Sequence, residues 1–375
     1  MSENSPIYNL ATSGVQGLVP YQPGKPITEL ERELGLTSIV KLASNENPLG
    51  PSPKVLSAIQ AALPDLSLYP DGNGYDLKMV LSAKYGVDYQ QITLGNGSNE
   101  ILELIARTFL SNKLSAVFSQ YAFAVYPLVT QAIGAQSLVA PAADGSKHPE
   151  FGHDLDAMSD TIDVNTRIVF IANPNNPTGT YLSSEQLSSF IQALPNNIIC
   201  VVDEAYFEYV KSEDNFDSMH WLADNPNLII TRTFSKAYGL AGLRIGYSIS
   251  STEIADLLNR VREPFNNNSL ALVAAEAALD DQGYLTQSIE INHTGMRQFI
   301  DFFKASDLQW IPSLGNFITV NLKRDALLVY QSMLERGVIV RPVANYGLPE
   351  HLRISIGTGA DNQRCINALT EILDV

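Results

Sequence analysis

Cysteine and basic residues are scarce in this chain of 375 residues. It has two cysteines, Cys200 and Cys365, and no Cys/His spacing typical of zinc ligands, so we expect no bound metal. The 24 Lys and Arg residues stand against 40 Asp and Glu residues, which gives a formal net charge of −16. That balance argues against nucleic acid and anionic membranes as main partners, because both attract basic surfaces.

Long apolar runs are missing as well. No run approaches the ~20 residues that a membrane-spanning helix needs. Residues 1–10 have neither the basic start nor the apolar core of a secretory signal, so we expect a cytoplasmic protein. Hydrophobic residues make up 45% of the chain, which is typical of a globular protein, and its length suggests two domains.

Short β-rich runs alternate with helical stretches between residues 76 and 250, a pattern that predicts an α/β fold. The runs are almost continuously apolar, which is typical of a mostly parallel sheet covered by helices on both faces. In such sheets a ligand binds beyond the carboxyl ends of the strands. The seven predicted strands cover residues 92–94, 116–118, 137–139, 168–172, 198–202, 228–231 and 244–249.

The sequence changes character near residue 262, where we predict the domain boundary. Residues 51–262 then form a large domain, and residues 263–375 form a smaller α+β domain that opens with a long helical pattern over 270–303. Residues 1–50 are rich in Pro, Gly and Asn. They predict an extended N-terminal arm with one short helix over 27–34.

Lys236 lies just after a predicted strand, within the run Thr-Phe-Ser-Lys-Ala-Tyr-Gly. A lysine forms an imine with an aldehyde when it is partly desolvated and its pKa is lowered. Hydroxyls at Thr233 and Ser235 and the guanidinium of Arg244 could bind a phosphate beside it. A Ser-Lys pair alone is more often a solvated loop, but the whole run predicts a cofactor site.

Three further motifs also follow predicted strands. Asp203 closes an apolar strand, where a carboxylate could pair with a pyridinium nitrogen or simply cap a helix. Asn176 lies among turn residues that alone predict only a loop, yet its amide could donate to a phenolic oxygen. The run Leu94-Gly-Asn-Gly-Ser-Asn-Glu100 precedes a helix, whose free amides attract anions. It lacks the third glycine of a dinucleotide site, which excludes a Rossmann dehydrogenase.

Together these motifs resemble the fold-type I pyridoxal-phosphate (PLP) aminotransferases over nearly the whole chain. The strings Asn-Pro-Asn-Asn-Pro-Thr-Gly, Asp-Glu-Ala-Tyr and Thr-Phe-Ser-Lys-Ala-Tyr-Gly-Leu-Ala-Gly-Leu-Arg are highly specific for that superfamily. Residues 18–21, 42–50 and 352–358 are similar to its histidinol-phosphate branch. The resemblance implies bound PLP and an obligate homodimer, in which the N-terminal arm packs against the small domain and the partner. It also implies amino transfer between histidinol phosphate and 2-oxoglutarate, giving imidazole-acetol phosphate and glutamate in histidine biosynthesis.

The same resemblance implies roles for individual residues. Lys236 carries the cofactor as a Schiff base and moves the substrate's α-proton, Asp203 pairs with the ring nitrogen, and Tyr121 stacks on the ring. The predicted ligands of the ring hydroxyl are Asn176 and Tyr206. The predicted phosphate ligands are Ser98, Asn99, Thr233, Ser235, Arg244 and, from the neighbouring subunit, Tyr69. The predicted substrate-binding residues are Tyr21, Asn47, Arg341 and Arg353.

The chain departs from the family pattern at two places, and other functions stay open. Asn99 stands where an Asp is usual, and Ser119-Gln120 stands where Pro-Thr usually precedes the stacking Tyr. An aromatic amino-acid aminotransferase and a threonine-phosphate decarboxylase would share most of these motifs. A PLP-binding transcriptional regulator would need a basic DNA-binding domain, for which the chain has neither the extra length nor the charge. Arg341 and Arg353 could also form surface ion pairs.

Overall fold

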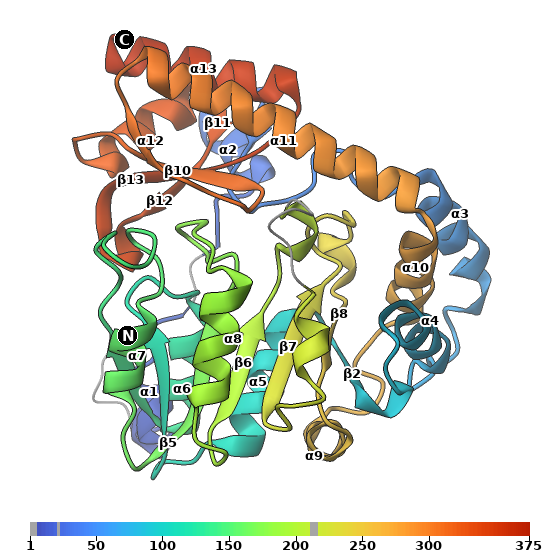
Figure 1. Cartoon of the computed structure of the whole chain (residues 1–375). Coiled ribbons are helices and arrows are strands. Elements are labelled where there is room, and N and C mark those ends of the chain that lie inside the picture. Colours follow the sequence, from blue (N-terminus) through green and yellow to red (C-terminus); the bar gives the residue numbers. More distant parts are fainter. Residues whose placement is uncertain (1–5, 21–22, 211–216) are drawn as a thin grey trace.

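A seven-stranded sheet forms the centre of the larger part of the protein (Figure 1). The computed structural model describes residues 6–20, 23–210 and 217–375. The strand order is β2-β8-β7-β6-β5-β3-β4, and β8 alone runs antiparallel to its neighbours. The predicted α/β fold with a mostly parallel seven-stranded sheet is therefore confirmed. The strands are β2 (Ile92–Gly95), β3 (Ser115–Ser119), β4 (Gln136–Ala140), β5 (Thr166–Ala172), β6 (Ile199–Asp203), β7 (Leu228–Thr233) and β8 (Gly246–Ile249).

Helices cover both faces of this sheet, and each face has its own hydrophobic core. In β3, Val117 packs into one core while Ala116 and Phe118 pack into the other, as alternation along a strand requires. The helices of the first face are α3 (Pro53–Ala62), α4 (Tyr75–Tyr85), α7 (Leu155–Thr161), α8 (Ser184–Ala193) and α10 (Ser269–Asp280). Those of the second face are α5 (Ser98–Phe109), α6 (Val125–Ile133) and α9 (Thr252–Val261).

A second, smaller sheet of order β12-β13-β10-β9 is entirely antiparallel and lies above the first in Figure 1. It has a separate core, shared with α11, α12 and α13. The strands are β9 (Gln309–Ile311), β10 (Phe317–Asn321), β12 (Arg341–Val343) and β13 (Leu348–Ser355). The helices are α11 (Gln282–Ala305), α12 (Ala326–Glu335) and α13 (Gly359–Leu373).

The N-terminal arm contacts both parts. Its strand β1 (Val40–Lys41) pairs in parallel with β11 (Val338–Ile339), and Leu30 of α2 (Ile27–Leu34) packs against Ile339. The short helix α1 (Ser13–Gln16) lies against α6 of the large sheet. None of the helices within the described residues combines the length and apolar character that a membrane crossing requires.

The predicted boundary near residue 262 lies too early in the chain. Helix α10 packs on α3 and α4, and Ala271 and Leu272 belong to the core of the large sheet. Leu285, in the first turn of α11, belongs to that core as well, whereas Met296 belongs to the core of the small sheet. We therefore place the boundary inside α11. The helical pattern predicted over 270–303 is two helices that meet at Asp281, whose carboxylate caps α11.

Candidate active site

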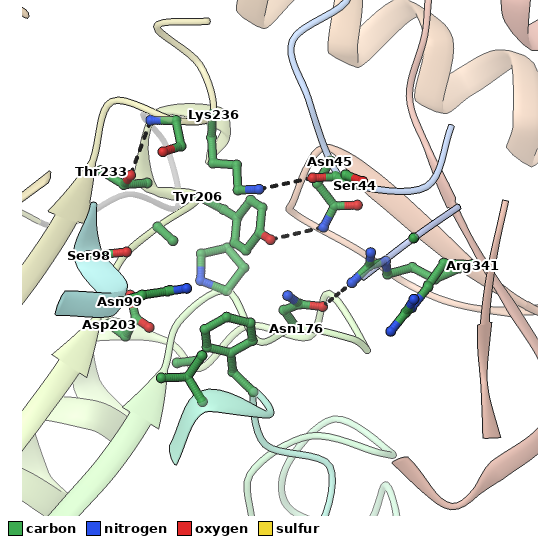
Figure 2. Close-up of a pocket in the computed structure, with 18 of the residues that line it drawn as sticks. Ser44, Asn45, Ser98, Asn99, Asn176, Asp203, Tyr206, Thr233, Lys236 and Arg341 are labelled. Carbon is green, nitrogen blue, oxygen red and sulfur yellow. Dashed lines mark hydrogen bonds between the residues drawn. The ribbon is translucent and has the colours of Figure 1, made fainter. Parts of the chain in front are cut away.

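A cavity of about 320 Å³ lies between the carboxyl ends of the large sheet and the small sheet (Figure 2). Strand ends, the N-terminal arm and the small sheet all contribute side chains, so the cavity exists only when the three are packed together. This is the edge at which α/β sheets bind ligands. The polar residues that line it are Ser44, Asn45, Ser98, Asn99, Asn176, Asp203, Tyr206, Thr233, Ser235, Lys236, Arg244, Arg341 and Arg353.

Lys236 follows β7 and points its amine into the cavity. Its Nζ donates to the carbonyl oxygen of Ser44 at 3.2 Å and lies 5.7 Å from the centre of the Tyr206 ring. Burial, followed by the positive charge of Arg353, lowers the pKa of Lys236 from 10.5 to about 7. A large share of the amine is therefore neutral near pH 7, which is what attack on a carbonyl carbon requires.

Asp203, the last residue of β6, presents a buried carboxylate to the same cavity. Its Oδ1 accepts from the Thr231 hydroxyl at 3.0 Å and its Oδ2 from the Tyr126 hydroxyl at 2.9 Å. Burial raises the pKa of Asp203, and the two hydroxyl donors oppose that rise. A buried carboxylate held in this way suits a cationic ring nitrogen.

An anion site lies where α5 begins. The free backbone amides of the first turn of α5 and the side chain of Arg244 border the same part of the cavity. Arg244 Nη1 donates to the Ser235 hydroxyl at 3.3 Å. Gly97, with φ of 79°, precedes the helix, and a Cβ there would lie 2.3 Å from Arg244 Nη2. The glycine is therefore required for the guanidinium to reach the helix N-terminus. Amides, hydroxyls and a guanidinium together suit a phosphate.

Two arginines of the small sheet face the cavity from neighbouring strands. Arg341 of β12 pairs with Arg353 of β13 in the strand register, so both side chains leave the sheet on the same face. Arg353 donates through Nη1 to Asn176 Oδ1 at 2.6 Å and through Nη2 to the carbonyl oxygen of Ala43 at 2.7 Å. The cavity thus has a second cationic wall, which comes from the small sheet, whereas Arg244 lies beside the large sheet.

Tyr206 lies between these groups. Its hydroxyl accepts from Asn45 Nδ2 at 2.9 Å, and burial raises its pKa to about 12. The phenol therefore stays protonated at neutral pH and acts as a hydrogen-bond donor or acceptor, not as an anion.

Most of the predicted site residues line this one cavity, but three of the described ones do not. Tyr21 lies outside the described residues. Asn47 donates instead to the carbonyl oxygen of Ala237 and to the Ser288 hydroxyl, because the arm turns so that Asn45 faces the cavity. Tyr69 is 83% exposed and stacks on Phe265 at 4.8 Å between ring centres. The phosphate that Tyr69 is predicted to bind would lie in the cavity of a second subunit.

Tyr121 is the third, and the prediction that it borders the cofactor site is not supported by its position. Its ring packs near Phe151, at 5.9 Å between centres, and its carbonyl oxygen accepts from Asn175. Phe123, two residues on, lines the cavity. The reason is that α6 begins only at Val125, so a loop follows β3 and brings Phe123 over the strand ends.

Tyr126 and Thr231, which hold Asp203, were not among the predicted residues. Thr231 could have been found from strand pairing, because it lies opposite Asp203 in the β6–β7 register and shares its face. No sequence signal points to Tyr126, because it reaches Asp203 across 77 residues of chain.

The family model for class I and II aminotransferases matches residues 37–369. The chain belongs to this family. Over 98% of its length and 99% of the relative's, this aminotransferase is 56% identical to histidinol-phosphate aminotransferase 2 of Methylococcus capsulatus. It is 58% identical to the protein of the same name from Pseudomonas fluorescens strain Pf0-1, over 97% of each chain.

Solved structures agree with this assignment. The histidinol-phosphate aminotransferase of Sinorhizobium meliloti, in complex with pyridoxal-5'-phosphate, matches this aminotransferase with a TM-score of 0.88 and 31% identity, over 97% of this chain and 98% of that one. The L-threonine-O-3-phosphate decarboxylase of Porphyromonas gingivalis matches with a TM-score of 0.77 over 90% of this chain and 100% of that one. At 24% identity, that second likeness concerns the fold alone.

Proposed function

We propose that this aminotransferase exchanges an amino group between histidinol phosphate and 2-oxoglutarate, giving imidazole-acetol phosphate and glutamate in histidine biosynthesis. One observation carries the substrate assignment. Arg341 and Arg353 share the cavity with Lys236, so a phosphate or a distal carboxylate can be held while the amine works on the other end of the substrate. Eight relatives at 53–58% identity bear the name histidinol-phosphate aminotransferase.

The cavity fits pyridoxal phosphate as the cofactor. The first turn of α5 with Arg244 would hold the phosphate, Lys236 would bond to the aldehyde carbon, and Asp203 would pair with the ring nitrogen. The further proposed phosphate ligands are Ser98, Asn99, Thr233 and Ser235, and the proposed ligands of the ring hydroxyl are Asn176 and Tyr206. Phe123 replaces Tyr121 as the proposed ring-stacking residue. When bound, the pyridinium ring supplies an electron sink for the bond that breaks at the substrate's α-carbon.

The side chains of the cavity bind the substrate and move its proton. Lys236, as a free amine, would take the α-proton of the substrate and would deliver it to the cofactor carbon that had carried the aldehyde, because its lowered pKa lets it act as both base and acid near pH 7. Arg353 binds the carboxylate of glutamate in one half-reaction and the phosphate of histidinol phosphate in the other, and Arg341 helps to hold the distal anion. Asp203 would keep the ring nitrogen protonated. Because the two half-reactions use one cavity, Arg353 has to accept both substrates in turn.

A homodimer and a cytoplasmic location form part of this proposal. Leu66, Leu68 and Tyr69 are exposed large apolar side chains close together in the chain, and Phe265 stacks against Tyr69. Such a patch is typical of a surface that another protein covers. In the proposed dimer Tyr69 would bind the phosphate of the cofactor held in the partner's cavity.

The experiment that tests the substrate is a half-reaction. PLP-loaded enzyme is mixed separately with histidinol phosphate, phenylalanine and threonine phosphate, and the absorbance of the bound cofactor is followed. We expect fast conversion with histidinol phosphate and slow conversion with phenylalanine. The reverse order would make the protein an aromatic amino-acid aminotransferase, and release of CO₂ from threonine phosphate would make it a decarboxylase.

We expect Gly97→Ala to weaken PLP binding by about tenfold or more. The new Cβ would lie 2.3 Å from Arg244 Nη2, and φ of 79° is strained for alanine. Binding is measured by equilibrium dialysis of the apoenzyme. Gly242→Ala, an exposed glycine with no atom within 4 Å of its Cβ position, is the matched control and should bind normally. Equal affinities of the two variants would argue against this phosphate site.

We expect the apoenzyme to capture PLP covalently about ten times faster at pH 8 than at pH 6, with a plateau above pH 8. A lysine cation is the stable form below its pKa, so the reactive neutral amine of Lys236 appears as the pH rises through about 7. Stopped-flow absorbance measures the rate. A rate that keeps climbing to pH 10 would mean that the amine has its ordinary pKa.

A further inference from the structure

Asp203 has a hydroxyl donor on each of its two carboxylate oxygens. Tyr126 donates to Oδ2 at 2.9 Å, and Thr231 donates to Oδ1 at 3.0 Å. All three residues are buried, and they come from three elements, α6, β6 and β7. The carboxylate is therefore fixed in its plane before any ligand binds, because rotation of the carboxyl group would break both hydrogen bonds.

Tyr126 is itself held rigidly. It lies in the first turn of α6, and its ring stacks on Phe170 at 4.7 Å with 7° between the ring planes. Phe123 meets it edge-on at 5.9 Å and 87°. Burial raises the pKa of the Tyr126 phenol well above its usual value, so the group stays a donor throughout the working pH range. The side chain that holds Asp203 also packs against Phe123, the aromatic residue of the cavity wall.

We propose that Tyr126 is a positioning residue for the cofactor site, whose hydroxyl orients the Asp203 carboxylate and keeps it ionised opposite the ring nitrogen of PLP. Thr231 performs the same task from β7. The inference rests on the proposed function, because it takes Asp203 as the partner of that nitrogen.

The sign of the expected effect follows from the competition at Asp203. Burial makes a carboxylate more basic, and hydroxyl donors make it less basic. Without Tyr126 the carboxylate draws the ring-nitrogen proton more strongly toward itself, so less positive charge remains on the ring. A smaller positive charge nearby leaves the proton on the Lys236 nitrogen harder to remove. The pH at which the holoenzyme's cofactor band titrates should therefore rise.

The experiment is a pH titration of the holoenzyme spectrum for wild type, Tyr126→Phe and Thr231→Val. Phenylalanine keeps the ring that stacks on Phe170 and removes only the hydroxyl. We expect each variant to raise the midpoint by about half a unit to one unit, and to release PLP several-fold faster on dilution. Thr231→Val provides a separate test should Tyr126→Phe fail to fold.

Two controls separate positioning from general stability. Phe303→Leu removes a buried ring from the separate core of the small sheet and leaves the contacts of Tyr126, Thr231 and Asp203 intact, so it should lower Tm and leave the midpoint unchanged. Asp203→Asn should shift the midpoint more than either hydroxyl variant. An Asp203→Asn shift without any shift in Tyr126→Phe and Thr231→Val would overturn this inference alone. An unchanged Asp203→Asn spectrum would overturn the assignment of Asp203 in the proposed function, and the inference with it.

Discussion

Replacing Lys236 with alanine is expected to slow amino transfer by about 10⁴-fold, the upper end of what one positioned proton-transfer group contributes. Among the described residues no other lysine lines the cavity, so no second amine can take the α-proton. Asp203 is held 2.9 and 3.0 Å from two hydroxyls that donate to it and cannot substitute as a base. The rate is measured as single-turnover conversion of histidinol phosphate.

PLP should still bind to Lys236→Ala, because the Gly97–Arg244 phosphate site is unchanged. The absorbance of a covalently bound cofactor should be lost, however, and a small added amine should restore part of the rate, since the cavity then has room for it. Lys113→Ala, at an exposed lysine, is the control and should behave as wild type. A Lys236→Ala enzyme that retained a tenth of the rate would remove Lys236 from the chemistry.

The fold could be predicted because the inner strands are buried on both faces and therefore appear as apolar runs. The antiparallel direction of β8 could not be predicted, because the composition of a strand does not show with which strands, or in which direction, it pairs. The predicted strand began at Arg244, whereas β8 begins at Gly246 and Arg244 adopts a left-handed backbone with φ of 57°. That conformation turns the guanidinium toward α5, so the residue belongs to the site and not to the sheet.

The site could be predicted wherever a side chain sits at the end of a regular strand. Asp203 ends β6 and Lys236 follows β7, so the sheet itself fixes their places. Tyr121 and Asn47 do not line the cavity, and the reason is the same for both. Both lie in irregular segments, where no helical or strand period determines which side chain faces inward. In each case a residue two positions away, Phe123 or Asn45, lines the cavity instead.

The second large effect is expected at the two arginines of the small sheet. Arg353→Gln should lower kcat/KM by about 100-fold or more with both glutamate and histidinol phosphate, because it removes the buried charge that orients either substrate. Arg341→Gln should lower it by a similar factor with histidinol phosphate and by much less with phenylalanine. Arg341 lies opposite Arg353 in the β12–β13 register, so the two side chains can share one phosphate, which phenylalanine lacks.

Arg336→Gln is the matched control. It removes an exposed ion pair between Arg336, which follows α12, and Glu371 of α13, and it should leave kcat/KM unchanged with each substrate. Arg353→Lys separates charge from geometry, since lysine keeps the positive charge but cannot donate at once to Asn176 and Ala43 as Arg353 does. Activity restored by lysine would mean that charge alone matters. Equal losses for Arg341→Gln with phenylalanine and histidinol phosphate would make Arg341 a general carboxylate ligand and would remove the structural argument for a phosphorylated substrate.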